Sequence, residues 1–284
     1  MKVLFVSDFS LDHNSGGAQV SNDAIIKKGE QLGHEIILHN FDSDYTDFLC
    51  SYDLIISSNL EVIYNKTPDK LNYIINHPNH VRLEHDSCLY LEVDKRKQLF
   101  GSSKINFFLS EFHVSFFRSM YGNIFSNIEI VFDPIDTNIF KIQPQNKTHD
   151  VVYCGFIHQL KGFDNLIKFA KDNPERTVDI FGWGSYDFEN LIKKYKNINY
   201  HGRISHAQTA EVYQRSNTIF HNPVVNEPFC RMVAEAILCG VKDLQGNESK
   251  IGSVQEYKRI GVEKFAENCM NAPQIFWDKI NEKI

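Results

Sequence analysis

Short apolar runs alternate with helical patterns along the first half of this 284-residue chain. Six runs read as strands: Val3–Ser7, Glu35–His39, Leu54–Ser57, Tyr73–Asn76, Ile105–Leu109 and Ile128–Val131. The helical patterns between them include Ala18–Leu32, Tyr90–Phe100 and Glu111–Met120. Strands that alternate with helices form parallel sheets covered by those helices, so we expect a Rossmann-like α/β domain here.

A second α/β series begins after a polar segment, Lys141–His149, which contains Pro144 and has no apolar period. Its expected strands and helices are Val151–Cys154, Phe163–Asp172, Val178–Phe181, Phe188–Lys194, Ile198–His201, His206–Gln214 and Thr218–His221, with a tight turn at Gly182-Trp183-Gly184. The predicted fold class is α/β, with two Rossmann-like domains facing across a cleft. The predicted domains are 1–141, 142–255 and a C-terminal helical segment, 256–284.

Composition and cysteine usage indicate a soluble, cytoplasmic protein. No apolar run approaches the roughly 18–20 residues of a membrane span. The apolar run after Met1 is too short for a signal peptide. Six cysteines without C-x-x-C pairs favour free thiols in a reducing compartment.

The formal net charge of −6 is concentrated in the first half. Up to Lys141 there are 12 basic and 19 acidic residues, which gives −7. This acidity argues against nucleic acid and against docking on anionic lipid. His77, His80 and His85 lie close in sequence, but nothing fixes a shared geometry, so no metal site is predicted.

The segment from Asn226 to Gly240 contains an acidic residue in an apolar setting. Met232, Val233, Ala234, Ala236, Ile237 and Leu238 surround Glu235 and indicate an enclosed helix. A buried carboxylate needs either polar protein groups or the hydroxyls of a ligand. Because proline suits the first helical turn, the helix is expected to start at Pro228 or Phe229, with its N-terminus available to phosphate.

Glu227 and Glu235, with seven residues between them and Ala-Ile-Leu-Cys-Gly after the second, resemble the E-x7-E signature of retaining group 1 (GT4-like) glycosyltransferases. That large family has the GT-B fold and includes bacterial mannosyl- and glucosyltransferases and sucrose-phosphate synthases. The resemblance implies a hexosyltransferase-type enzyme, EC 2.4. It would take a UDP- or GDP-sugar as donor and a glycan or small molecule as acceptor, with retention and without a metal or other cofactor.

The resemblance also assigns roles around the donor. Tyr153–Ile167 resembles the family's Y-x-G-R-x-x-x-x-K-G-x-D-x-L-I, so Lys161 would pair with the donor diphosphate. Glu227 would bind the donor sugar and Glu235 the ribose. The other donor-binding candidates are Gly16, Gly17, Gly182, Arg203, Ile204, Pro228, Phe229, Cys230 and Arg231.

His85-Asp86 resembles the family's His-Asp, whose histidine reaches the transferred sugar, so the catalytic candidates are Glu227, His85 and Lys161. In the family, a C-terminal helix such as Ala272–Ile284 packs back on the first domain. This helix could equally be an interaction helix.

Two positions depart from the family. Asp133-Pro134 stands where Asn-Gly is usual, and Phe156 stands where an arginine donates two hydrogen bonds to phosphate. Three other readings therefore stay open. The two glutamates are structural, or the chain is a catalytically degenerate nucleotide-sugar or glycan-binding subunit, or it is a nucleotide-sugar epimerase of the same fold.

Overall fold

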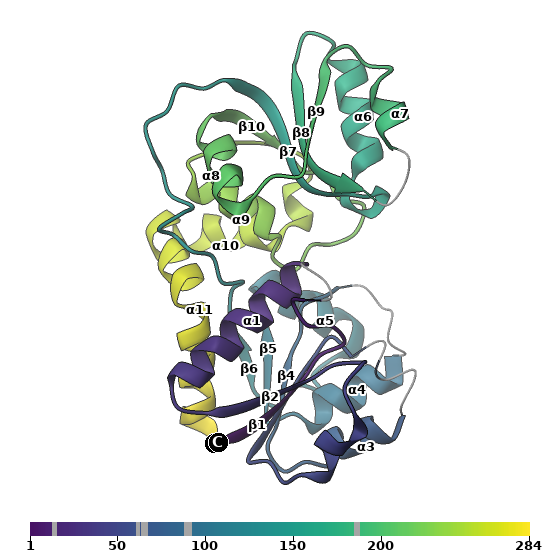
Figure 1. Cartoon of the computed structure of the whole chain (residues 1–284), viewed down its shortest axis with the longest axis vertical. Coiled ribbons are helices and arrows are strands. Elements are labelled where there is room, and N and C mark those ends of the chain that lie inside the picture. The colour runs from purple at the N-terminus through teal and green to yellow at the C-terminus, as the bar shows by residue number, and fades with distance from the viewer. Residues whose placement is uncertain (13–15, 61–62, 64–67, 88–92, 185–187) are drawn as a thin grey trace. The chain divides into compact units, whose positions relative to one another are not determined.

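The computed structural model describes residues 1–12, 16–60, 63, 68–87, 93–184 and 188–284. These residues form two compact units, Met1–Pro134 with Asn268–Ile284 (unit 1) and Ile135–Glu267 (unit 2). Unit 2 thus begins seven residues before residue 142, where the second domain was predicted to start. The C-terminal residues Asn268–Ile284 belong to unit 1. Figure 1 labels the helices and strands of both units.

Unit 1 contains a six-stranded parallel sheet in the order β2-β1-β3-β4-β5-β6. The strands are β1 (Lys2–Val6), β2 (Glu35–His39), β3 (Leu54–Ser58), β4 (His80–Leu83), β5 (Ile105–Phe108) and β6 (Ile128–Ile130). The helices between them are α1 (Gly17–Gln31), η1 (Tyr45–Leu49), α3 (Pro68–Ile75), α4 (Val93–Ser102) and α5 (Glu111–Tyr121). The α/β prediction is therefore confirmed for this half.

Successive side chains of β1 pack on opposite faces of the unit 1 sheet. Val3 and Phe5 belong to one core cluster, which also contains Ile25 of α1. Leu4 and Val6 belong to another, which also contains Leu71 of α3. Because side chains alternate along a strand, a continuous apolar run such as Val3–Val6 requires cover on both faces of its sheet.

The last helix, α11 (Val262–Lys283), contributes four buried side chains to the core of unit 1: Ala272, Phe276, Trp277 and Ile280. The Trp277 indole N–H donates a 2.8 Å hydrogen bond to the Ile25 carbonyl. The ring also packs against Gly29, where an added Cβ would lie 2.4 Å from Trp277 Cζ2. The indole thus fills the space that a side chain at position 29 of α1 would occupy.

Unit 2 contains a five-stranded parallel sheet in the order β11-β10-β7-β8-β9. Its strands are β7 (His149–Ile157), β8 (Val178–Gly184), β9 (Ile198–Gly202), β10 (Ser216–Phe220) and β11 (Asp243–Gln245). Its helices are η2 (Gln159–Lys161), α6 (Phe163–Asp172), α7 (Phe188–Ile192), α8 (His206–Gln214), α9 (Arg231–Leu238), η3 (Glu248–Lys250) and α10 (Gly252–Ile260). Figure 1 shows α6 and α7 beside one face of this sheet and α8 and α9 beside the other.

Two expected elements were wrong. Tyr73–Asn76, predicted as a strand, lies mostly in α3, and the strand is instead His80–Leu83. The aromatic and β-branched residues were taken for a strand signal, but they form the apolar stripe of a helix. Gly182-Trp183-Gly184, predicted as a turn, continues β8, because Gly182 pairs with Gly155 in register. Residues 90–92 of the predicted helix Tyr90–Phe100 lie outside the described residues.

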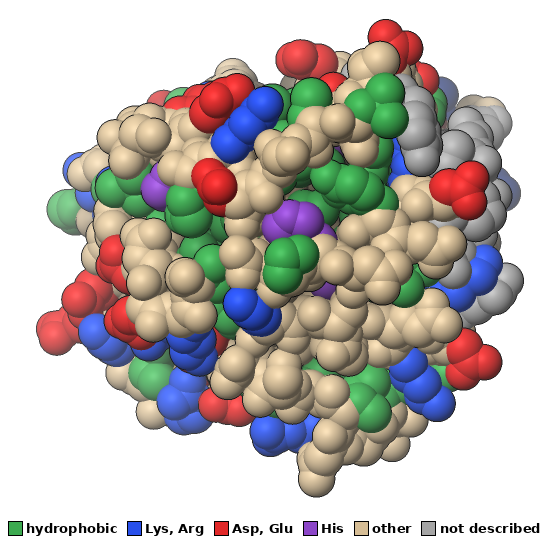
Figure 2. Space-filling model, turned by 90° about the horizontal axis from the view of Figure 1, so that it is seen from below, with side chains coloured by type: hydrophobic (Ala, Val, Ile, Leu, Met, Phe, Trp, Pro, Cys, Tyr) green, Lys and Arg blue, Asp and Glu red, His purple; other side chains and the backbone are tan. Residues whose placement is uncertain are grey.

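Every helix within the described residues is too short or too polar to cross a lipid bilayer. On the face drawn in Figure 2, the acidic and basic side chains that are described intermingle.

The contact between Gly29 and Trp277 predicts a destabilising Gly29→Ala variant. Alanine usually stabilises a helix interior by up to about 1 kcal/mol relative to glycine. Here the new methyl would collide with a buried indole, so the free energy of unfolding is expected to fall by about 1–3 kcal/mol in urea denaturation.

Gly101→Ala in α4 is the matched control, since an added Cβ meets no atom within 4 Å there. It should leave stability unchanged or raise it slightly. A Gly29→Ala variant as stable as Gly101→Ala would contradict the described packing of α11.

Candidate functional site

The strand order of unit 2 reverses between β7 and β10, which pair with each other in parallel. In open parallel sheets, ligands bind beyond the carboxyl ends of the two strands where the order reverses. The chain that leaves β7 carries Lys161, and the chain that leaves β10 carries Glu227. The Lys161 ammonium donates to both carboxylate oxygens of Glu227, at 2.8 and 3.1 Å.

A glycine lets these two chain segments approach. Gly162 has φ of +85°, a conformation that glycine adopts without strain. A Cβ at this position would lie 2.0 Å from the backbone carbonyl oxygen of Asn222. The Asn165 side-chain amide donates a 2.8 Å hydrogen bond to the same carbonyl. The turn after Lys161 is thus held directly against the segment that leads to Glu227.

The Lys161–Glu227 pair is buried on one side only. Glu227 is 7% exposed, whereas the Lys161 side chain is 43% exposed. Burial tends to raise the pKa of Glu227, but Lys161 and His221 outweigh it and lower the pKa from 4.5 to about 2. Glu227 is therefore a carboxylate at neutral pH, and its lysine partner can move into solvent.

The predicted start of the helix at Pro228 or Phe229 was wrong, because α9 begins at Arg231. The backbone of Glu227 bridges to Ile251: its N–H donates to the Lys250 carbonyl and its carbonyl accepts from the Gly252 N–H. These bonds keep the chain extended through Glu227. Pro228 and Phe229 are buried, and the Phe229 ring stacks on Phe265 at 5.8 Å.

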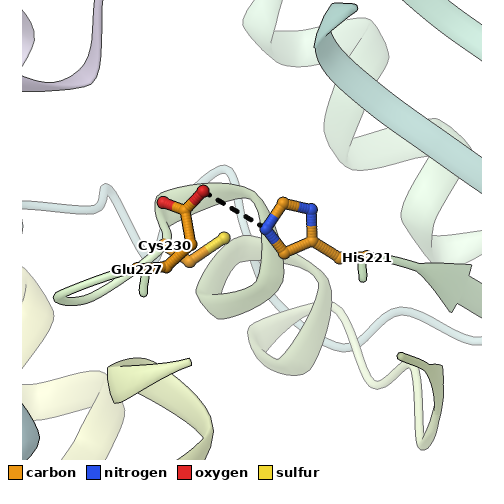
Figure 3. A group of neighbouring side chains, drawn as sticks. All are labelled: His221, Glu227 and Cys230. Carbon is orange, nitrogen blue, oxygen red and sulfur yellow. Dashed lines mark ion pairs between the residues drawn. The ribbon is translucent and has the colours of Figure 1, made fainter. Parts of the chain in front are cut away.

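Cys230 turns the chain into α9 with φ of +73°, a left-handed conformation that is unusual for a non-glycine residue. Its side chain lies near those of Glu227 and His221, as Figure 3 shows. Burial tends to lower the pKa of His221, but Cys230 and the Glu227 carboxylate raise it to about 9. No sequence motif identified His221. Its position at the end of β10, before Glu227, was the available signal.

Glu235 is buried, at 5% exposure, and has polar protein neighbours. Its Oε1 accepts a 3.4 Å hydrogen bond from the Arg231 guanidinium and lies 3.8 Å from His206 Nε2. Burial and the nearby Arg231 lower the pKa of His206. Among the described residues, the buried Arg231 Nη1 has no hydrogen-bond partner. The arrangement thus fits a paired core glutamate and leaves one guanidinium nitrogen of Arg231 able to donate.

The remaining candidates of unit 2 lie near the ends of β8 and β9. At Gly182 an added Cβ would lie 1.9 Å from the Gly155 carbonyl oxygen, so the glycine is required for strand pairing. The Arg203 guanidinium lies 4.4 Å from the centroid of the Trp183 ring, and Ile204 is half-buried. Phe156 is 38% exposed, and its ring stacks on His158 at 5.7 Å. Sequence reasoning identified Phe156 as a departure from the family but did not predict its stacking on His158.

The other three candidates belong to unit 1. Gly16 caps α1 with an ordinary φ of −71°, and Gly17 is the first residue of α1. His85 is buried, with Nε2 2.9 Å from Asn22 Oδ1 and Nδ1 3.8 Å from Asp133 Oδ1. Burial lowers the pKa of His85 although Asp133 raises it.

Asp133, a departure from the family pattern, has a structural partner, because its carboxylate accepts a 2.7 Å hydrogen bond from Ser21 Oγ. His77 and His80 also have protein partners: the Tyr52 carbonyl oxygen for His77, and Ser57 and Ser102 for His80. Within the described ranges, the group of His, Cys, Asp and Glu side chains close enough to share a metal ion is His221, Glu227 and Cys230.

Residues 134–247 match the sequence model of the family described as "Glycosyl transferases group 1". This segment, less than half of the chain, contains the Lys161–Glu227 pair. No curated protein matches the chain in a sequence comparison.

Solved structures resemble the whole chain. HepE of Anabaena, in complex with UDP-glucose, has a TM-score of 0.63 at 16% identity, over 100% of this chain and 95% of HepE. Sucrose-phosphate synthase of Thermosynechococcus elongatus has a TM-score of 0.67 at 12% identity, over 99% and 96%. An alpha-glucosyltransferase, in complex with UDP and a DNA 13-mer, has a TM-score of 0.61 at 11% identity, over 99% of both chains. At these identities the likeness shows the fold, which is GT-B.

The lowered pKa of Glu227 predicts a specific loss of stability in acid. With a pKa of about 2 when folded and 4.5 as the reference value, this carboxylate contributes stability fully above 4.5 and loses it as pH falls through about 2. The free energy of unfolding should therefore fall more in wild type than in Glu227→Gln between about pH 6 and about pH 3. The expected difference is on the order of 1–2 kcal/mol in urea denaturation.

Glu282→Gln, at an exposed position of α11, is the control and should show the pH dependence of wild type. If Glu227→Gln loses as much stability in acid as wild type does, Glu227 is not held as a carboxylate by Lys161.

Proposed function

We propose that the chain is a glycosyltransferase that moves a sugar from a nucleotide diphosphate sugar to an acceptor. The observation that carries the proposal is the Lys161–Glu227 pair at the point where the strand order of unit 2 reverses. That point lies in the segment that matches the group 1 glycosyltransferases. Structural neighbours crystallised with UDP and UDP-glucose add support for a UDP- or GDP-sugar donor.

The chemistry of the donor explains why a lysine and a carboxylate are needed together. Breaking a bond between a sugar and a diphosphate leaves positive charge on the sugar and accumulates negative charge on the leaving group. In our proposal the donor separates the ion pair. Lys161 stabilises the diphosphate, and Glu227 accepts hydrogen bonds from the sugar hydroxyls.

The half-exposed Lys161 side chain makes this exchange feasible, since the ammonium can leave Glu227 without crossing the core. We assign the rest of the donor to neighbouring residues. Arg231, with a buried nitrogen able to donate, adds charge beside the diphosphate, and Glu235 binds the ribose hydroxyls. The N-terminus of α9, preceded by Pro228, Phe229 and Cys230, adds its free amides. Gly182, Arg203 and Ile204 line the nucleobase.

The remaining parts of the proposal concern the acceptor and the stereochemistry. We assign residues 1–141, with Gly16, Gly17 and His85, to the acceptor side and residues 142–255 to the donor. Of the final segment, 256–284, residues 268–284 belong to unit 1 and pack on this acceptor side, whereas residues 256–267 belong to unit 2. Transfer is of a hexosyl group, as in a GT4-like enzyme, with retention and without a metal, because the lysine and helix amides already answer the developing charge.

A glycan or small-molecule acceptor agrees with the acidity of the first half of the chain, which disfavours nucleic acid. The five cysteines described as free thiols favour a reducing cytoplasm.

One observation favours a second function, a catalytically degenerate subunit that binds nucleotide sugar or glycan. Phe156 places an exposed aromatic ring where the resembled family has a phosphate-binding arginine. An aromatic ring cannot donate the two charge-assisted hydrogen bonds of a guanidinium. Binding could then persist while leaving-group stabilisation is lost.

Nucleotide release by wild type distinguishes these functions, and release by Glu227→Ala tests the role of Glu227. If Glu227 holds the donor sugar in the transition state, its loss should lower kcat by about a hundredfold or more, as removal of one electrostatic contact commonly does. The measurement is release of UDP or GDP from the matching nucleotide sugar, with a mixture of glycan acceptors. Glu175→Ala, an exposed carboxylate elsewhere in unit 2, is the control and should retain wild-type turnover.

Unchanged turnover in Glu227→Ala would remove Glu227 from the mechanism. A wild-type protein that binds the nucleotide sugar but releases no nucleotide would favour the degenerate subunit.

A further inference from the structure

Three different metal-ligand types meet beside the Lys161–Glu227 pair. One ring nitrogen of His221, one carboxylate oxygen of Glu227 and the sulfur of Cys230 all lie within 4.8 Å of one another. Figure 3 shows the imidazole of His221 directed toward the carboxylate and the thiol. The three side chains come from the end of β10, the extended segment after it and the residue that caps α9.

The environment of the His221 ring is a second observation that points to a ligand. It is 2% exposed, yet neither ring nitrogen has a hydrogen-bond partner among the residues that the structure describes. Nε2 lies 3.6 Å from Glu227 Oε1, beyond hydrogen-bond distance. His221 is thus held by its ion pair with Glu227, but both buried ring nitrogens lack a hydrogen bond, which costs about 1–3 kcal/mol for a buried polar group and favours a further binding partner.

The ligand set selects the metal. Zinc binds histidine nitrogen and carboxylate oxygen at about 2.0–2.2 Å and thiolate sulfur at about 2.3 Å, in tetrahedral geometry. Neighbouring ligand atoms around such an ion are therefore roughly 3.3–3.8 Å apart. The 3.6 Å between His221 Nε2 and Glu227 Oε1 falls in this range, and the distances from the Cys230 sulfur to the other two ligand atoms are no more than 4.8 Å.

We propose that His221, Glu227 and Cys230 form a binding site for one zinc ion, with the fourth position open to water. Binding forms bonds from zinc to nitrogen, oxygen and sulfur, and it releases to solvent the thiol proton and any proton on His221. No oxidation or reduction is involved.

Lys161 sets the condition for zinc to bind. Its ammonium lies 2.8 Å from Glu227 Oε1, the oxygen that also faces His221. A zinc ion and the ammonium would repel each other strongly at this oxygen, so zinc binds as the half-exposed lysine swings into solvent. Where the proposed transferase activity holds, zinc would occupy the carboxylate that binds the donor sugar and would inhibit the enzyme.

The test measures zinc affinity by competition with a chromophoric chelator, in the absence of any nucleotide sugar. Wild type should bind one zinc ion per chain. Cys230→Gly should weaken binding about tenfold or more, since loss of even an outer hydrogen-bond partner of a metal ligand commonly costs that much. This variant should fold, because glycine suits the left-handed backbone at position 230.

Two further variants sharpen the test. Lys161→Met removes the competing cation and should tighten zinc binding. Cys50→Ser removes an exposed thiol far along the chain and should leave the affinity unchanged. With cobalt in place of zinc, the wild type should show a thiolate-to-metal charge-transfer band that Cys230→Gly lacks.

Equal zinc affinity in wild type and Cys230→Gly, or weaker binding in Lys161→Met, would overturn the proposal. Because no nucleotide sugar enters the assay, these outcomes are independent of whether the chain transfers sugars. If the chain showed no transferase activity, zinc would have no enzyme to inhibit. The zinc site itself would still be tested by these affinities.

Discussion

The candidate site depends on one structural constraint, the parallel pairing of β10 with β7. The strand order reverses at this pair, and in open parallel sheets ligands bind beyond the carboxyl ends of the two strands where the order reverses. Gly162 allows the segment that leaves β7 to touch the segment that leaves β10, and the bridge between Glu227 and Ile251 fixes the latter against α10. The Lys161–Glu227 ion pair forms where these constraints meet, and Cys230 and His221 are positioned by the same segment.

Sequence reasoning predicted most of the fold because long apolar periods determine it. The strand that contains Val3 and the buried face of α11 were both predicted from the spacing of their apolar residues. It failed where tertiary contacts override local preference. Tyr73–Asn76 has strand-like residues but packs as a helix, and Pro228 suits a helix start, yet Glu227 is bonded to residues far along the chain. The role of His221 and the Asp133–Ser21 hydrogen bond could not be predicted. The burial and the partners of a single polar residue produce no periodic pattern in a sequence.

The buried charges divide into two kinds. Glu235 lies among polar protein groups, and one nitrogen of its partner Arg231 remains able to donate to a ligand. Glu227 instead shares one oxygen between Lys161, at hydrogen-bond distance, and His221, which is too far to bond. An ion pair with one solvent-exposed partner beside an unsatisfied imidazole is an arrangement that a ligand can rearrange. The proposed sugar donor and the proposed zinc ion would both bind by displacing Lys161 from Glu227.

The central claim, that unit 2 binds a nucleotide diphosphate sugar, is tested most directly by thermal shifts. Wild type and Glu235→Ala would be heated with UDP, GDP, ADP and their sugar derivatives. A ligand at about a hundred times its dissociation constant adds roughly 2.7 kcal/mol of stability, which raises the Tm by several degrees. The account predicts such a shift with one nucleotide family, lost in a still-folded Glu235→Ala. No shift with any nucleotide, or an equal shift in both proteins, would contradict it.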